Sequence, residues 1–121
     1  MHYIGIDIIE IARIERAITR WGQSFLHRIY TDLELGLCHK KPASLAARFA
    51  GKEAVVKALG TQNKGISWKE IEILSESSGK PLVHLQGKAQ NQANSLGLNN
   101  LAISLSHSRQ YAIAFVVGET K

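Results

Sequence analysis

The sequence lacks the features of secreted and membrane proteins. Its 121 residues include one cysteine, Cys38, which cannot form an internal disulfide, and this is typical of a reducing compartment. No apolar run approaches the ~20 residues that a bilayer-spanning helix needs. The N-terminal segment MHYIGIDIIE has neither the basic region nor the small-residue cleavage site of a signal peptide. We therefore expect a cytoplasmic protein that does not associate with a membrane.

Linkers, aromatic residues and acidic charge are also scarce. No internal repeat, low-complexity tract or Pro/Gly-rich linker interrupts the sequence, so residues 1–121 are predicted to form a single small domain. The net charge of +5 favours acidic partners through long-range attraction. Aromatic residues make up 7% of the chain and do not interleave with the basic ones, which weighs against a nucleic-acid-binding surface.

A strand that we expect to be buried is predicted at residues 3–9, and it contains one carboxylate. The residues alternate between two faces, with Ile4, Ile6 and Ile8 on one and Tyr3, Gly5, Asp7 and Ile9 on the other. A buried charge is costly unless a partner offsets it, so Asp7 needs a partner. Alternatively, Asp7 caps a backbone group at the strand end.

Helices are predicted for much of residues 11–59. An apolar stripe ending before Gly22 is formed by Ile11, Ile14, Ile18 and Trp21, and a basic stripe on the same helix is formed by Arg13, Arg16 and Arg20. A short amphipathic segment from Phe25 to Tyr30 precedes a capping box made by Thr31 and Glu34. The longest helix is expected from about Leu45 to Leu59, with Ser44 as its N-cap and Gly60 at its end.

The second half of the chain is rich in strands. Residues 70–73 alternate, and the turn at 77–81 leads into residues 82–86, which predicts a hairpin. A short helix ending at Gly97 is followed by strands at 101–105 and 111–117, joined by a turn. The expected order is one strand, three helices, a hairpin, a helix and a second hairpin. This order predicts an α+β fold with a largely antiparallel sheet packed on a long helix.

The long helix contains a second unusual carboxylate. Glu53 lies on the apolar stripe, four residues after Phe49 and three before Val56. If the helix packs on the first strand, Glu53 and Asp7 could meet, and two close carboxylates repel unless a cation neutralises them. A few oxygen ligands suit Mg²⁺, which often shares a substrate phosphate. Alternatively, Glu53 pairs with Lys57 on the helix surface, for ~0.2–0.5 kcal/mol.

Three segments together resemble the 4′-phosphopantetheinyl transferases. Residues 49–60, FAGKEAVVKALG, resemble the signature helix of that family, and residues 5–8, GIDI, resemble its first strand. Residues 103–108, ISLSHS, followed by Tyr111 and Ala112, resemble its closing hairpin, and GKP at 79–81 also fits. The chain length is that of the small, single-lobed branch, the holo-acyl-carrier-protein synthases.

The resemblance implies an activity and an assembly. The enzyme would transfer the phosphopantetheine arm of coenzyme A to a serine of apo-acyl carrier protein and release adenosine 3′,5′-bisphosphate. This reaction supports fatty acid, and hence lipid, biosynthesis. The resemblance also implies a homotrimer with sites at subunit interfaces and Mg²⁺ held by Asp7 and Glu53. Lys57 would add positive charge at the phosphates, or else form a plain surface ion pair. The identity of the general base stays open.

Several further residues are candidates for contacts with coenzyme A or the carrier. The resemblance places His107 and Ser108 near the nucleotide phosphates, contributed by a neighbouring subunit, although His107 could simply stabilise its turn. The other candidates for coenzyme A are Arg48, for the 3′-phosphate, Phe49, which is either core or in contact with adenine, Gly60 and Pro81. Acyl carrier proteins are strongly acidic, so the stripe of Arg13, Arg16 and Arg20 is the expected docking face, unless it is merely a solvated helix face.

Two other functions remain as alternatives. The first is a small basic nucleic-acid-binding domain without catalysis, which the positive charge motivates but which leaves Asp7 and Glu53 unexplained. The second is a non-catalytic trimeric scaffold that has kept the fold. The presence of Asp7, Glu53 and Lys57 argues against it.

Overall fold

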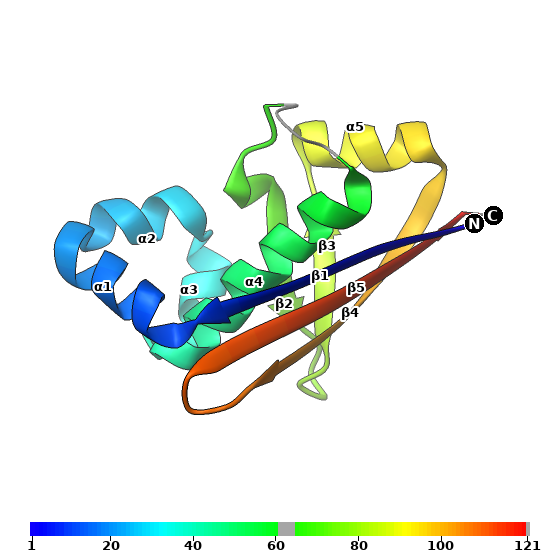
Figure 1. Ribbon diagram of the computed structural model, residues 1–121. Coiled ribbons are helices and arrows are strands. Elements are labelled where there is room, and N and C mark those ends of the chain that lie inside the picture. Colours follow the sequence, from blue (N-terminus) through cyan, green and yellow to red (C-terminus); the bar gives the residue numbers. More distant parts are fainter. Residues whose placement is uncertain (61–64, 121) are drawn as a thin grey trace.

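The computed structural model describes residues 1–60 and 65–120, which form an α+β fold (Figure 1). In chain order its elements are β1 (His2–Glu10), α1 (Ile11–Trp21), α2 (Gln23–Ile29), α3 (Asp32–Cys38), α4 (Pro42–Leu59), the 3₁₀ helix η1 (Trp68–Glu70), β2 (Ile71–Ser75), β3 (Pro81–Leu85), α5 (Gly87–Leu96), β4 (Leu98–His107) and β5 (Tyr111–Thr120). Four helices, rather than the predicted three, follow β1, because the segments around Phe25 and Leu35 are separate helices. The rest of the predicted order is confirmed.

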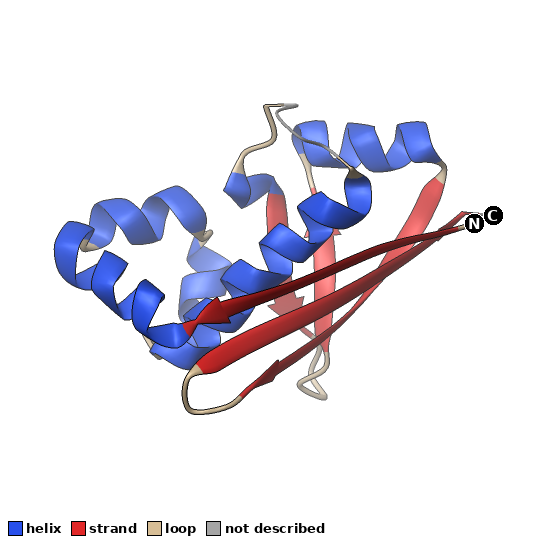
Figure 2. Cartoon of the chain, in the orientation of Figure 1, coloured by secondary structure: helices blue, strands red, loops and turns tan. Residues whose placement is uncertain are grey.

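The strands form two antiparallel sheets instead of one. The larger sheet has the order β1-β5-β4, and the smaller sheet is the β2-β3 hairpin. Helix α4 packs against one face of the larger sheet and also contacts β2. No described helix covers the other face of the larger sheet (Figure 2). The chain is therefore layered, with α4 between the two sheets and one sheet face left open.

Strand β1 is buried on one face only, so the prediction of a fully buried strand is wrong. Gly5 and Ile9 are buried on the side of α4. The opposite face carries three isoleucines with exposures of 57%, 51% and 61%, namely Ile4, Ile6 and Ile8. They pair across the ladder with three apolar residues of β5, namely Val117, Phe115 and Ile113. We call these six residues the apolar sheet face.

Helix α4 begins earlier than predicted and is buried along most of its length. It starts at Pro42 with Lys41 as its N-cap, so Ser44 is not the cap. Proline is favoured at the first helical position, where its missing N–H would have had no intrahelical partner. The helix ends at Gly60, as predicted, with a left-handed backbone at φ 65°. None of the described helices is long and apolar enough to cross a membrane.

Buried charged side chains bond to the edge of β2 that pairs with no described strand, where a further strand would otherwise pair. The Lys52 ammonium donates to the Ile71 carbonyl, and Arg48 Nε donates to the Ile73 carbonyl at 3.1 Å. The Ile73 N–H donates to Glu34 Oε2 at 2.8 Å. Strand edges with unpaired backbone groups invite unwanted pairing. Three side chains from α3 and α4 therefore close this edge and tie the hairpin to the helices.

Gly5 sets how closely β1 approaches α4. A Cβ atom at this position would overlap the Ala54 carbonyl and come within 2.9 Å of the Ala58 nitrogen. Because backbone cannot move aside as a side chain can, Gly5→Ala is expected to lower the free energy of unfolding by about 3 kcal/mol. Urea denaturation measures this loss.

Gly36→Ala provides a matched control for the Gly5 variant. Within residues 1–60 and 65–120, a Cβ atom at Gly36 would meet nothing within 4 Å, and alanine is the better helix former. This variant is expected to be at least as stable as the parent. Equal urea midpoints for both variants would show that the β1–α4 contact is not close-packed at Gly5.

Candidate active site

The inner face of β1 turns Asp7 towards α4, where it meets Lys57. The side chain of Asp7 is 11% exposed. Lys57 Nζ donates to Asp7 Oδ1 at 3.1 Å and to the Ile6 carbonyl at 3.0 Å. Lys57 of α4 is therefore the partner that the Asp7 carboxylate of β1 requires.

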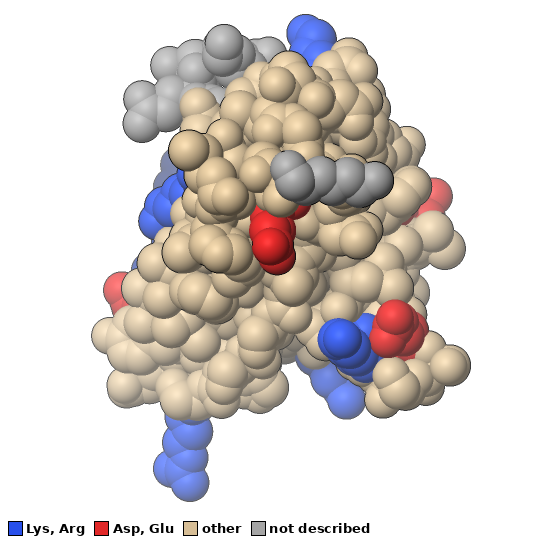
Figure 3. All heavy atoms as spheres, turned by 90° about the vertical axis from the view of Figure 1, so that its right-hand side faces the viewer, with Lys and Arg blue, Asp and Glu red and all other residues tan. Residues whose placement is uncertain are grey.

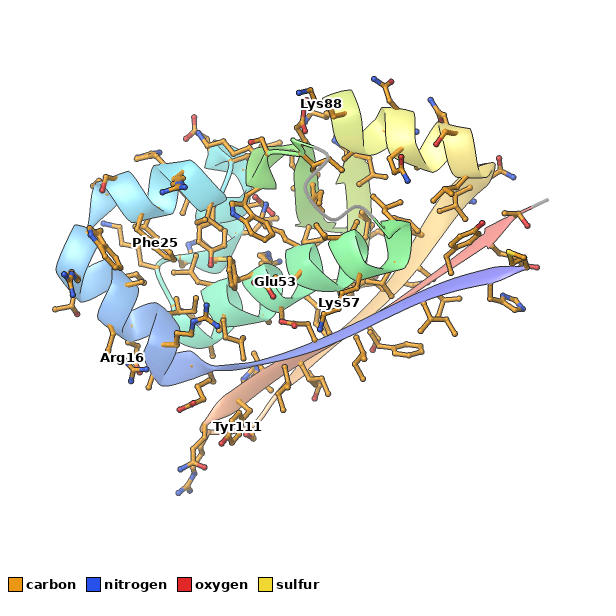
Figure 4. All side chains as sticks on the ribbon, turned by 45° about the horizontal axis from the view of Figure 1, so that its top comes forward. Arg16, Phe25, Glu53, Lys57, Lys88 and Tyr111 are labelled. Atoms are coloured by element: carbon orange, nitrogen blue, oxygen red, sulfur yellow. The ribbon has the colours of Figure 1, made fainter. Side chains whose placement is uncertain are left out.

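Glu53 lies near Asp7, close enough for the carboxyl group of Asp7 to influence that of Glu53. Figure 4 shows Glu53 and Lys57 extending from α4 on the side of β1. Partial burial raises the pKa of Glu53, and the neighbouring Asp7 raises it further, whereas the charges of Arg13 and Lys57 lower it. Two neighbouring carboxylates favour a shared proton or a bound cation.

The donor set at this point suits a magnesium ion. Carboxylate oxygens are hard ligands, and Mg²⁺ typically binds one or two of them together with waters and substrate phosphate oxygens. Within the described residues, no cluster of three or more His, Cys, Asp and Glu side chains could enclose a metal. Asp7 and Glu53 therefore fit an open Mg²⁺ site, whose other ligands would be waters and a substrate phosphate, and they do not fit a closed structural site.

The basic stripe of α1 borders the acid pair. Its members, Arg13, Arg16 and Arg20, line a groove of about 440 Å³ together with Trp21, Phe25 and Phe49. Arg13 is close enough to Glu53 to lower the pKa of that carboxyl group. Arg20 lies over the Trp21 ring, 5.0 Å from its centroid. The groove thus has basic side chains beside aromatic ones, and one of its residues, Arg13, acts on Glu53.

Phe49 and Gly60, both predicted to contact coenzyme A, occupy different environments. Phe49 is buried, and its ring centroid lies 5.3 Å from that of Trp68, so it belongs to the core and to the wall of the α1 groove. Gly60 follows Lys57 by one helical turn and donates its N–H to the Lys57 carbonyl. Among the described residues, a Cβ atom at Gly60 would meet nothing within 4 Å.

The other predicted coenzyme A contacts lie at two further places in the fold, the β2–β3 hairpin and the turn after β4. Arg48 is 9% exposed and donates to the Ser75 hydroxyl, and Ser75 is paired with Pro81 in the β2–β3 hairpin. His107 ends β4, and the Ser108 hydroxyl accepts backbone N–H groups within the following turn. Among the described residues, no hydrogen bond or ion pair joins these four predicted contacts to either carboxylate. The predicted site residues are therefore spread over several elements of the single chain.

The sequence reasoning missed a buried ion pair next to the site. Lys52 Nζ lies 2.8 Å from Glu34 Oε1, and both side chains are 0% exposed. Glu34 does form the predicted capping box with Thr31, but its carboxylate also reaches the core. The available signal was a lysine inside the apolar run of α4, where a charge needs a buried partner.

Comparisons with known proteins identify the family of the chain. Residues 3–116 match the model of the 4′-phosphopantetheinyl transferase superfamily. The chain belongs to this superfamily. It is a 4′-phosphopantetheinyl transferase of the holo-acyl-carrier-protein synthase type, which confirms the resemblance carried by the three sequence segments.

Individual phosphopantetheinyl transferases resemble the chain over nearly its full length. The holo-[acyl-carrier-protein] synthase of Dehalococcoides mccartyi strain CBDB1 is 55% identical, covering 98% of this chain and 99% of the relative. That of Herpetosiphon aurantiacus is 50% identical, covering 94% and 95%. The crystal structure of the Helicobacter pylori enzyme in complex with coenzyme A has a TM-score of 0.87 and 38% identity, covering 96% and 99%.

Proposed function

We propose that the protein transfers the 4′-phosphopantetheine arm of coenzyme A to a serine hydroxyl of an apo-acyl carrier protein. The reaction depends on Mg²⁺, releases adenosine 3′,5′-bisphosphate and supports fatty acid biosynthesis in the cytoplasm. The observation that carries this proposal is the convergence of Asp7, Glu53 and Lys57 beside a basic helix. It is supported by the names of the relatives and by the coenzyme A complex of the Helicobacter pylori enzyme.

The residues of the site have separable roles in this proposal. Asp7 and Glu53 hold Mg²⁺, which supplies charge neutralisation at the phosphoryl group when it is bound. Lys57, which is anchored by the Ile6 carbonyl, adds a positive charge at the same phosphates. Gly60 ends α4 one turn after Lys57 and is proposed to let coenzyme A approach this helix end. Because catalysis of phosphoryl transfer is mostly positioning and charge stabilisation, these fixed groups are the ones that the reaction needs.

We further propose that the protein is a homotrimer whose sites lie between subunits. Two observations support this assembly. The apolar sheet face is exposed in the single chain, and such patches mark interaction surfaces. His107 and Ser108 also have no hydrogen bond or ion pair to the acid pair within the described residues, so a second copy could bring its own turn after β4 to the first copy's carboxylates.

Helix α1 is the proposed docking surface for the carrier. Arg13→Glu is expected to raise the KM for apo-carrier about 10-fold, a loss of about 1.4 kcal/mol, and to change the KM for coenzyme A much less. Arg16→Glu, which is further from the metal ligands, should act in the same way. Steady-state kinetics with each substrate varied in turn measures both constants.

Lys88→Glu is the matched charge reversal for the docking prediction. Lys88 lies on α5, far from Arg16 and Glu53 in Figure 4. The Lys88→Glu variant should leave the KM values for apo-carrier and for coenzyme A unchanged. Equal rises of the two KM values in the Arg13 and Arg16 variants would count against α1 as the docking surface.

The nucleic-acid-binding alternative is not favoured. The face of the molecule in Figure 3 shows scattered charged side chains of both signs and no continuous basic patch. The basic residues that do gather, on α1, surround an aromatic groove beside two carboxylates. This acid pair would weaken binding to nucleic acid, because its carboxylates repel phosphates unless a cation is bound.

A mass measurement tests the proposed reaction. The protein is incubated with coenzyme A, Mg²⁺ and an apo-acyl carrier protein, and the carrier is then weighed by mass spectrometry. A gain of one phosphopantetheine that disappears with a chelator is the expected result. No gain with several different carriers would overturn the proposal and favour the scaffold or nucleic-acid alternatives.

A further inference from the structure

Helix α4 presents polar side chains on two neighbouring faces. Glu53 and Lys57 face β1, whereas Arg48 and Lys52 face α3 and β2. Lys52 and Glu53 are consecutive, so their directions differ by about 100° around the helix axis. Any rotation of α4 that moved Lys52 would therefore move Glu53 relative to Asp7.

Apolar burial alone does not select the rotation of α4. The helix is buried on almost every side, and much of its buried surface is small, formed by Gly51 and by Ala46, Ala47, Ala50, Ala54 and Ala58. A helix that is buried on nearly every side lacks the single apolar stripe that normally decides which face turns inward. Directional contacts must therefore contribute to the choice.

Lys52 supplies such contacts from a fully buried position. Its ammonium donates to Glu34 Oε1 at 2.8 Å, to the Trp68 carbonyl at 3.0 Å and to the Ile71 carbonyl. All three donors of the ammonium group are thus used. Glu34 is itself held by the N–H groups of Thr31, at 2.9 Å, and Ile73, at 2.8 Å. Turning α4 would break bonds to a buried charge, which is strongly unfavourable.

We propose that Glu34 and Lys52 are positioning residues that hold α4 in the rotation that places Glu53 against Asp7. The pair thereby sets the affinity of these two carboxylates for a divalent cation. This inference rests on the proposed metal site. A buried ion pair often adds little net stability compared with a neutral pair of similar shape. We therefore expect the Glu34–Lys52 pair to position α4 and to contribute little to the free energy of unfolding. Position and stability are then separable by experiment.

The test is the double variant Glu34→Gln/Lys52→Met, which replaces the pair with neutral side chains of similar shape. Binding of Mn²⁺ to the full-length protein is measured from the electron paramagnetic resonance signal of the free ion, and stability from thermal unfolding. We expect Mn²⁺ to bind at least 10-fold more weakly, with a midpoint within a few degrees of the parent. The transfer rate should fall without a change in the KM for apo-carrier.

Ile73→Val is the matched control for a general loss of packing. Its side chain lies under Gly51 in the same region, and its truncation leaves every bond of Lys52 in place. It should lower the unfolding midpoint and leave Mn²⁺ affinity unchanged. If the ion pair had a purely structural role, the affinity for Mn²⁺ would decrease together with the unfolding midpoint in both variants.

Each outcome of this test decides a different claim. Unchanged Mn²⁺ affinity in a folded double variant overturns the positioning role and leaves the metal site intact. If the parent itself binds no Mn²⁺, the metal site is wrong, and this inference fails with it. If the double variant does not fold, Glu34→Asp, which keeps the charge but shortens its reach, is tested instead. Unchanged affinity in that variant also overturns the proposal.

Discussion

Replacing Glu53 with glutamine is expected to lower the transfer rate by a factor of about 10³ while making the metal-free protein more stable. The rate falls because the variant loses one of the two negative ligands of the proposed Mg²⁺ site. Stability rises because burial and Asp7 both disfavour the charged form of Glu53 in the folded chain. Glutamine has a similar shape and no charge to bury.

The pH dependence of this stabilisation follows from the direction of the pKa shift. The folded pKa of Glu53 is raised above its ordinary value of 4.5, so the folded state binds more protons between these two values. The stability of the parent therefore decreases as pH rises through this window, and that of the glutamine variant does not. The difference in free energy of unfolding should grow from about pH 4.5 upwards and become constant above the folded pKa.

Chelator-treated samples and transfer assays check both parts of this prediction. Thermal unfolding of parent and variant is recorded across the pH window, and transfer is followed by the mass of the carrier. Asp32→Asn, at a side chain that is 96% exposed, is the control and should leave the transfer rate unchanged. A Glu53→Gln protein that is less stable than the parent at neutral pH, or that retains the parental rate, would contradict this account of the site.

Placing a charge at the centre of the apolar sheet face is expected to dissociate the proposed trimer. Ile6 is 51% exposed in the single chain and lies opposite Phe115, so a lysine there would be buried without a partner on assembly. Ile6→Lys should therefore sediment as a monomer and lose transfer activity by about 100-fold or more, because about 3 kcal/mol of assembly energy is at stake. The monomer should remain folded, since the side chain points away from α4.

Leu33→Lys is the matched control for this change. Leu33 is an apolar residue of α3 with 64% exposure, and it lies outside the apolar sheet face. It should leave both the sedimentation coefficient and the activity unchanged. If Ile6→Lys retains the parental mass, or if the parent is itself a monomer at micromolar concentration, subunit assembly through this sheet face is wrong.

Local pattern was enough to predict most of the secondary structure. The alternation in β1, the stripe that ends at Gly22 and the Thr31 capping box each depend on neighbours within a few residues. The α+β class was predicted for the same reason. Failures occurred where local signals compete: Ser44 is a good cap, but Pro42 at the first helical position starts α4 earlier.

Features that depend on tertiary contacts were less accessible to sequence reasoning. The alternation in β1 assigned Ile4, Ile6 and Ile8 to one face, but it could not say that this face lacks a covering layer. The bonds from Lys52 to the edge of β2 depend on a hairpin about 20 residues later in the chain, and no local spacing reveals such contacts. From the sequence, Gly5 was simply one residue of the predicted strand. In the structure a larger side chain there would overlap the backbone of α4.

The residues of the candidate site were predictable to different degrees. Asp7 and Glu53 are conspicuous because each is a carboxylate on an otherwise apolar surface, and the packing of β1 on α4 brings them together. Arg48, Pro81, His107 and Ser108 were assigned through family resemblance, and their contacts with coenzyme A stay predictions. The single domain and the cytoplasmic location also stay predictions.

The most direct test of the central claim is crystallography with manganese. Crystals are grown with Mn²⁺ and coenzyme A, and anomalous differences are collected at the manganese absorption edge. The account predicts one strong peak bonded to oxygens of both Asp7 and Glu53, at about the 2.1 Å typical of small divalent ions. No anomalous peak between these two carboxylates, or a peak held by other residues, would contradict it.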